Sequence, residues 1–217
     1  MAIKANEIIE IKPIQIRQAT VHIVGDTPLI MHAWSEKAKR EMLEKQMKVT
    51  KTKAKTAKNP VEDFIRSMYW LSPMPEEMTE DAFNEAIHNG ARFGFPVTGF
   101  KQAAISAAYR MGWSKDKASL RGAFFIECDD DQMIEIKSDP PIMREDMVKL
   151  LGQTADIRYR GEFRNWSADL TISFNENGQY TLEQIINIIN AGGYVCGVGE
   201  WRPERDGQFG MFHIATT

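Results

Sequence analysis

Cysteine is nearly absent from this chain of 217 residues. Only Cys128 and Cys196 occur, and the sequence has neither a CxxC pair nor a cluster of cysteine and histidine. Structural zinc sites are built from such clusters, and disulfide frameworks need several cysteines. We therefore expect a protein of a reducing compartment that holds no metal and needs no cofactor.

Long hydrophobic runs and an excess of positive charge are also missing. No apolar stretch is long enough to span a bilayer, and Lys4, Glu7, Glu10 and Lys12 interrupt the region where a secretory signal would lie. These absences predict a cytoplasmic protein without a membrane partner. The net charge of −3 argues against coating of nucleic acid by bulk charge, so any anion site must come from a local patch.

What the chain does have is a glycine-rich stretch near its end. Six glycines fall within residues 192–210, and Arg202 and Arg205 lie among them. The stretch follows a predicted helix capped by Thr181 and precedes a short strand, the reverse of the order in a dinucleotide-binding loop. Glycine backbone with interleaved arginine suits phosphate groups. The alternative is a hairpin whose arginines are solvated or paired with Glu200, Glu204 and Asp206.

Lysine is concentrated in one segment, residues 35–58, whose second half has almost no apolar side chain. Its basic residues are Lys37, Lys39, Arg40, Lys45, Lys48, Lys51, Lys53, Lys55 and Lys58. Such a segment is most often a solvated helix face or a mobile loop. Its functional interpretation is a flexible basic arm that follows a phosphate backbone or reaches a neighbouring molecule, with Lys51, Lys53 and Lys55 as the contacts.

The rest of the pattern predicts a mixture of strands and helices. Residues 3–31, with a break at 25–28, indicate a hairpin or a long bent strand. A helix is expected from Thr79 to Gly90, and an alanine-rich helix after a turn at 96–99, with Lys101 in its first turn.

Two further regions predict strands. Two short strands are expected around the acidic turn 129–131, which lacks the spacing of a calcium loop. Alternating apolar side chains predict the most regular strand of the chain at Trp166, Ala168, Leu170, Ile172 and Phe174. A second arginine cluster lies just before this strand and comprises Arg158, Arg160 and Arg164.

Four stretches, in order along the chain, resemble the RAMP superfamily, the RRM-like proteins that include the backbone subunits of CRISPR effector complexes. They are 24–30, 95–110, 166–174 and 197–210. The resemblance implies an α+β fold with a ferredoxin-like or RRM-like antiparallel sheet and helices on one face. It also implies a single domain over 1–217 with a basic insertion at 35–60. The whole chain further resembles a family of phage and prophage proteins.

The resemblance implies a function as well. Members of the superfamily assemble side by side along single-stranded nucleic acid and hold it through its backbone. We accordingly expect a phage-encoded, non-enzymatic protein of the bacterial host cytoplasm that binds single-stranded RNA or DNA without sequence preference. It would form a helical or filamentous homo-oligomer, with host or phage recombination or defence proteins as further partners.

The residues expected at the nucleic acid follow from the same motifs. Phosphate contacts are expected from Lys101, Arg110, Arg158, Arg160, Arg164, Arg202 and Arg205, together with the loop at Gly199. Base stacking is expected from Tyr159 and Trp201. These groups would form one cationic track in which the C-terminal hairpin and the turn before the alanine-rich helix converge.

Two alternatives from other classes remain open. A metal-independent endoribonuclease would use a histidine, as some members of the superfamily do, and His32 is the candidate. General acid–base catalysis would also need a lysine or tyrosine partner, which the sequence does not identify. A phage inhibitor or mimic of a CRISPR backbone subunit would act by protein–protein binding, which the acidic net charge is compatible with. A nucleic-acid absorbance signature in purified material separates this second alternative from nucleic-acid binding.

Overall fold

The computed structural model describes residues 12–34, 36–48, 57–149 and 155–215. Its central sheet has the order β10-β1-β9-β5, and every neighbouring pair is antiparallel. The strands are β1 (Ile16–Gly25), β5 (Phe124–Ile126), β9 (Ser167–Asn175) and β10 (Phe212–Ile214). Lys51, Lys53 and Lys55 of the expected basic arm lie outside the described residues.

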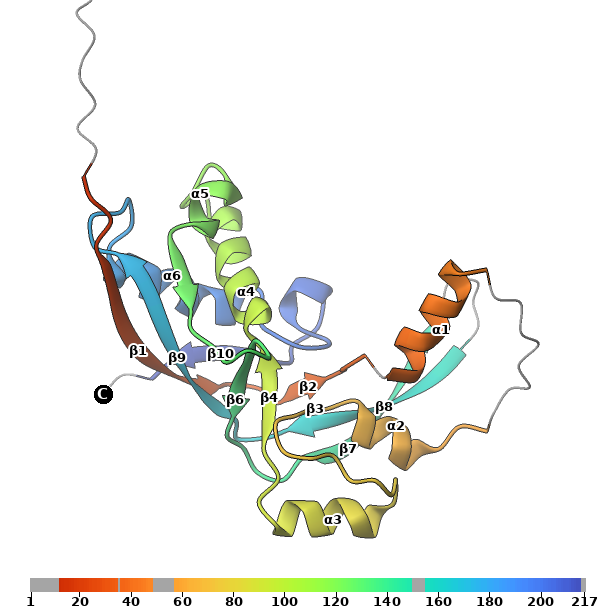
Figure 1. The fold of residues 1–217 in the computed structure, drawn as a ribbon. Helices are drawn as coiled ribbons and strands as arrows, with labels where there is room; N and C mark the ends of the chain where they lie inside the picture. The colour runs from red at the N-terminus through yellow and green to blue at the C-terminus, as the bar shows by residue number, and fades with distance from the viewer. Residues whose placement is uncertain (1–11, 35, 49–56, 150–154, 216–217) are drawn as a thin grey trace, which may run out of the picture.

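Two long helices complete this layer. Helices α4 (Val97–Arg110) and α6 (Leu182–Val195) pack against each other and cover one face of the sheet, as Figure 1 shows. The four strands and two long helices of this layer follow one another along the chain in the order β1, α4, β5, β9, α6, β10. With the strand order above, this is the βαββαβ arrangement of a ferredoxin-like fold. The predicted α+β class, antiparallel sheet and one-sided helices are thus confirmed.

Two excursions interrupt the βαββαβ core. Residues 26–96 carry β2 (Leu29–Met31), α1 (Glu36–Gln46), α2 (Pro60–Arg66), β3 (Tyr69–Trp70), α3 (Glu80–His88) and β4 (Phe93–Pro96). Residues 127–166 carry β6 (Met133–Ile136), β7 (Ile142–Lys149) and β8 (Ala155–Phe163). Their strands form two further sheets, of order β2-β8-β7 and β3-β4-β6. The expected insertion at 35–60 lies within the first excursion.

Local sequence explains the regular elements. The apolar face predicted for β9 is buried from Trp166 to Phe174, because it faces the helices. Thr79 caps α3, and Thr181 forms a reciprocal capping box with Gln184 at the start of α6, as the sequence predicted for both caps. The two strands expected around 129–131 exist but do not pair with each other, since β5 joins β9 and β6 joins β4.

Helix α6 extends beyond the expected helix–loop boundary. Gly192 and Gly193 were predicted to open the glycine-rich loop, but both lie inside the helix. A Cβ atom on Gly192 would come within 2.8 Å of the Ala104 backbone, and one on Gly193 within 1.9 Å of the Phe212 carbonyl oxygen. These two glycines therefore allow α4 and β10 to pack directly on the α6 backbone.

No helix in the described part of the chain is both long and apolar enough to cross a membrane. The same residues contain no group of three or more histidine, cysteine or acidic side chains placed to hold a metal ion.

Candidate nucleic-acid interface

The N-terminal half of α4 borders two adjoining hollows in the molecular surface. The helix follows β4 directly, starts at Val97, and has neither a capping side chain nor an acidic residue in its first turn. Lys101 is therefore in the second turn, not in the first as predicted, because the helix begins before Gly99. Thr98 and Gln102, one turn apart, line both hollows.

The first hollow, here called the cationic cleft, lies between α4 and the short helix α5 (Lys117–Arg121) and measures about 450 Å³. It is lined by Thr98, Lys101, Gln102, Ile105, Ser106, Lys117 and Arg121. The Nζ of Lys117 donates to Ser106 Oγ over 3.4 Å. All lining residues are described, and none is a carboxylate. The cleft thus gathers three positive side chains without a negative one.

Lys101 is a partly buried cation of the cationic cleft. Its Nζ lies 4.0 Å from the centroid of the Phe125 ring, a cation–π contact at the edge strand β5. Burial lowers the pKa of Lys101 below its ordinary value, because no carboxylate offsets the cost of desolvating the ammonium group. Phe125 itself is 56% exposed. The side of the cleft next to β5 therefore presents an unneutralised ammonium group on an accessible aromatic ring.

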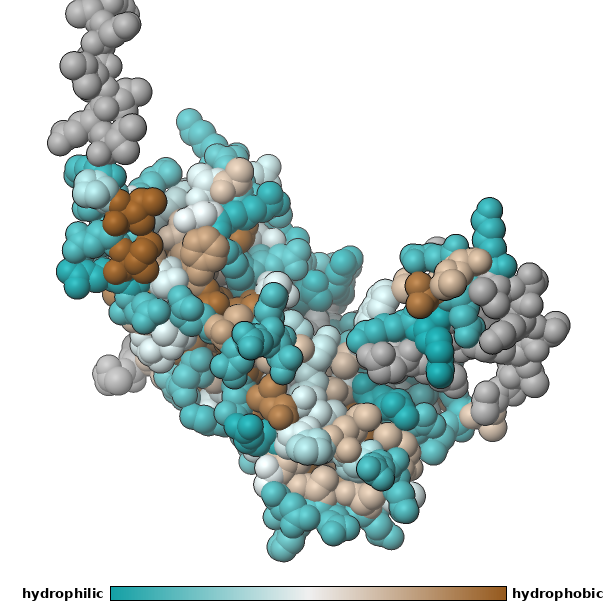
Figure 2. All heavy atoms as spheres, in the orientation of Figure 1, coloured by the Kyte–Doolittle hydropathy of each residue, from teal (hydrophilic) through white to brown (hydrophobic). Residues whose placement is uncertain are grey.

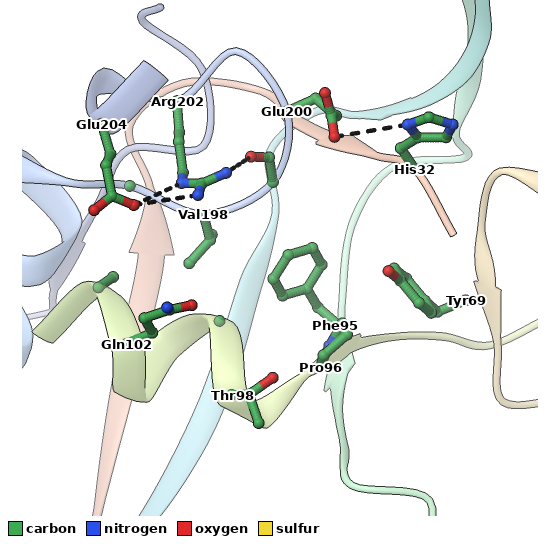
Figure 3. A pocket seen from close by; sticks show the side chains of 14 residues that line it. His32, Tyr69, Phe95, Pro96, Thr98, Gln102, Val198, Glu200, Arg202 and Glu204 are labelled. Carbon is green, nitrogen blue, oxygen red and sulfur yellow. Dashed lines mark hydrogen bonds and ion pairs between the residues drawn. The ribbon is translucent and has the colours of Figure 1, made fainter. Parts of the chain in front are cut away.

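The second hollow, here called the polar cavity, adjoins the cationic cleft along Thr98 and Gln102 and measures about 230 Å³. It brings together β3, the start of α4 and the glycine-rich loop. Figure 3 shows Tyr69, Phe95, Thr98 and Gln102 around it, with His32 and Glu200 at one end and Arg202 and Glu204 at the other. The expected convergence of the C-terminal loop with the turn before α4 is confirmed, but the space between them is not the predicted cationic track, because Glu200 and Glu204 line it.

Glu200 organises the charges of the polar cavity. Its carboxylate lies 3.6 Å from His32 Nδ1 and 3.5 Å from Nη2 of the buried Arg160. The close approach of His32 lowers the pKa of Glu200, and the charge of Arg160 lowers it further, while burial opposes both. Burial, and then the charge of Glu200, raise the pKa of Tyr69. Glu200 is therefore an ionised acceptor, and Tyr69 keeps its hydroxyl proton as a donor.

Arg202 closes the opposite end of the polar cavity through internal contacts. Its Nη1 donates to the Gly199 carbonyl oxygen over 2.9 Å, and its Nε and Nη2 each donate to Glu204 over 3.2 Å. Nη2 of Arg110 binds the other oxygen of Glu204 at 3.1 Å. For Arg202, the alternative interpretation is correct: this arginine of the glycine-rich stretch is paired with an acidic residue of the same loop. Arg202 and Arg110 are not the free phosphate contacts that were predicted.

The second arginine cluster is also neutralised within the chain. Arg160 is buried and contacts Asp146 at 3.1 Å, Arg158 contacts Asp156 at 2.9 Å, and Arg164 contacts Glu162 at 2.8 Å. The pairing of β7 with β8 brings Asp146 to the cluster, which the sequence of either strand alone does not reveal. The prediction that Arg158, Arg160 and Arg164 belong to one continuous cationic track is therefore wrong.

The glycine-rich loop is shaped by contacts with its own protein. Gly199 has φ +80°, and a Cβ atom there would lie 2.5 Å from the Ile30 carbonyl oxygen. The N–H of Glu200 donates to that same oxygen, and the N–H of Val198 donates to Gly210. Glycine at 199 thus serves the packing of the loop on β2, and these N–H groups are not available to a phosphate.

The other predicted contacts lie away from the cationic cleft. Arg205 is exposed at the end of the 3-10 helix η1 (Pro203–Arg205), and no ion pair involves it within the described residues. Trp201 is 37% exposed with φ +53°, and Tyr159 is half-buried on β8. Neither aromatic residue lines the cationic cleft or the polar cavity.

Lys101 was predicted from the sequence, but Lys117, Arg121 and Phe125 were not. The sequence did contain a signal for two of these residues. Lys117 and Arg121 are spaced i, i+4 with no acidic residue between them, so a helix would place both on one side. The sequence also failed to identify Tyr69, a tyrosine that lines the polar cavity together with His32.

Comparisons with known proteins give a fold similarity at most. No protein-family model and no curated protein matches the chain. Among solved structures, it is similar to the crystal structure of Cmr6 from Pyrococcus furiosus, with a TM-score of 0.37 and 11% identity over 94% of this chain and 100% of that one. The ferredoxin-like fold rests on strand order, and membership of the RAMP superfamily stays a prediction.

Proposed function

We propose that the protein binds single-stranded nucleic acid, with backbone phosphates seated in the cationic cleft. The observation that carries the proposal is the meeting of Lys101, Lys117 and Arg121 in one hollow without a carboxylate, in a chain of net charge −3. Phosphate oxygens suit ammonium and guanidinium donors, and a phosphate would offset the desolvation that lowers the pKa of Lys101. The uncapped start of α4, without an acidic side chain, also favours an anion.

Phe125 supports a single strand as the ligand. Proteins that bind single strands without sequence preference combine a cationic groove with aromatic rings on which bases stack, at about 1–3 kcal/mol per base. Phe125 is exposed and contacts Lys101, so phosphate and base contacts would lie side by side. The bases of a duplex are already stacked on each other, so they are not free to stack on an aromatic side chain of the protein. RNA and DNA remain equivalent in this proposal.

The proposal is tested by a Lys101→Ala/Arg121→Ala variant, with binding to a fluorescent oligonucleotide measured over a range of salt concentrations. Removing one phosphate contact should reduce the slope of log affinity against log salt by about 0.7 for a single strand. For the double variant we expect a slope smaller by about 1.4 and an affinity at least tenfold weaker at low salt.

The matched control is Arg17→Ala/Arg164→Ala. It removes the same charge from two exposed arginines that pair with Glu176 and Glu162, outside both hollows. This control should retain the wild-type slope. Equal slopes for wild type and the Lys101/Arg121 variant would refute the cationic cleft as the phosphate site. Absence of any binding by the wild type would favour a partner-binding protein.

Self-assembly along the strand is part of the proposal. Met42, Leu43 and Met47 of α1 are exposed to 47%, 55% and 66%, and Figure 2 shows apolar side chains over this helix. A groove of about 610 Å³ runs along α6, lined by residues that include Met111, Trp113, Tyr180 and Tyr194. A contact between two different surfaces of identical copies is heterologous and builds rings or filaments. Electron microscopy with and without an oligonucleotide tests it, and single particles under both conditions would refute assembly.

We propose no catalytic role for His32, although Tyr69 now supplies a partner at the same cavity. A phosphodiester placed there would face the carboxylates of Glu200 and Glu204, whereas the cationic cleft has none. Labelled RNA incubated with the wild type and with His32→Ala should stay intact in both samples. Cleavage by the wild type that disappears in His32→Ala would establish the endoribonuclease instead.

A further inference from the structure

The side chains that line the polar cavity have no role in the proposed phosphate binding. Two aromatic rings stand against it, Tyr69 and Phe95, whose centroids are 5.9 Å apart in an edge-to-face arrangement. Uncharged polar groups come from α4, and one ionised acceptor comes from Glu200. Cavities for drug-sized ligands measure about 300–1,000 Å³, so a volume of 230 Å³ suits one small, flat, polar group.

We propose that the polar cavity holds one nucleobase that carries an exocyclic amino group, splayed out of the strand bound at the cationic cleft. This inference rests on the proposed function and adds base preference to it. Proteins that read single strands commonly place an unstacked base against an aromatic side chain and bind its Watson–Crick edge. Tyr69 and Phe95 supply the aromatic wall, and Figure 3 shows Gln102 and Glu200 on different sides of the same space.

The preference for an amino group follows from Glu200. Its lowered pKa keeps it ionised, so it accepts hydrogen bonds and donates none. Cytosine, adenine and guanine present amino N–H donors on the edge that would meet it. Uracil and thymine have O4 in place of the amino group of cytosine, and their single N3–H donor lies between two carbonyl oxygens that a carboxylate repels. Gln102 and the Tyr69 hydroxyl supply donors for the remaining acceptors of the base.

The two hollows are placed for one continuous strand. Thr98 and Gln102 line both, so the cationic cleft and the polar cavity meet along this edge of α4. A strand crossing α4 could therefore stack one base on Phe125, seat phosphates at Lys101, Lys117 and Arg121, and insert a later base beside Glu200.

The test compares oligo(dC) with oligo(dT) of the same length at neutral pH, using the full chain. Both are flexible pyrimidine strands with identical backbones, so their difference isolates the edge of the base. A good base contact discriminates by about 1–3 kcal/mol, and we expect oligo(dC) to bind about tenfold more tightly. Glu200→Gln should abolish this ratio, because an amide both accepts and donates. Glu135→Gln, an exposed carboxylate outside both hollows, is the matched control and should preserve it.

A second variant protects the test from a folding defect. Glu200 also contacts the buried Arg160, whereas Gln102 lies at an exposed position of α4, so Gln102→Leu removes a polar group at little risk to the fold. It should reduce the oligo(dC) to oligo(dT) ratio. Equal binding of the two oligonucleotides by the wild type, or a ratio unchanged in both variants, overturns the nucleobase site and leaves the cationic cleft standing. Absence of all binding in the wild type overturns both.

Discussion

Two hollows share the same two side chains of α4 and yet differ in electrostatic character. Thr98 and Gln102 line both, but the cationic cleft adds three positive groups, and the polar cavity adds Glu200 and Glu204 with their internal partners. The difference arises from what each neighbouring element carries. Helix α5 brings cations without acids, whereas the glycine-rich loop brings arginine and glutamate together. An anion site is therefore marked by unpaired charge and not by the number of basic residues.

Placing a carboxylate in the cationic cleft should have the largest effect on binding, because it removes the difference in charge between the two hollows. Lys101→Glu removes a phosphate contact and adds repulsion, and a hydrogen bond to a charged group is worth about 1.5–3 kcal/mol. We expect oligonucleotide affinity to fall on the order of 100-fold at low salt. Thermal unfolding should change little, because Lys101 makes no ion pair within the described residues. Wild-type affinity in this variant would contradict the assignment.

The pH dependence sharpens the contrast further. Burial lowers the pKa of Lys101, so its ammonium group loses its proton below the ordinary value of 10.5. Phosphate binds the charged form, and affinity should therefore fall as pH rises toward 10. In Lys101→Arg the guanidinium stays charged, so this variant should keep its affinity severalfold better under alkaline conditions. Identical alkaline profiles for the two proteins, measured by fluorescence anisotropy, would remove Lys101 from the phosphate site.

The smallest effect concerns the glycine-rich loop, where Arg202 and Arg205 differ although they are only three residues apart. Arg202→Ala deletes contacts to Glu204 and to the Gly199 carbonyl, and should lower the free energy of unfolding by about 1–3 kcal/mol. Arg205→Ala, at an exposed position, should change it by less than about 0.5 kcal/mol. Denaturant titration measures both values. A stable Arg202→Ala variant that loses salt-sensitive binding would restore the arginine of the loop as a phosphate contact.

Local signals predicted the parts of the fold that local physics determines. Thr79 and Thr181 cap the helices they were expected to cap, and the alternation from Trp166 to Phe174 gives the inner strand β9. The approach of the glycine-rich loop to α4 also followed from the order of the motifs. Gly192 and Gly193 were misassigned because their role is close packing inside a helix, which the sequence does not distinguish from a loop.

Charge pairing could not be predicted in the same way. Arg160 meets Asp146 only because β7 and β8 pair in one particular register, and Arg110 meets Glu204 across 94 residues of sequence. Five of the arginines that were predicted to contact phosphate are therefore paired with carboxylates of the protein. Lys117 and Arg121 were not predicted, because two cations in a short helix form no conspicuous cluster until α5 packs beside α4.

The central claim is that a single strand crosses the first turns of α4 between the two hollows. Photocrosslinking with an oligonucleotide that carries 5-iodocytosine, followed by peptide mapping, tests it most directly. We predict crosslinks to Phe125 and to Tyr69 or Phe95, the aromatic residues beside the cationic cleft and the polar cavity. Crosslinks confined to 158–164 and 201–205 would contradict the claim and return the binding surface to the arginines of β8 and of the loop.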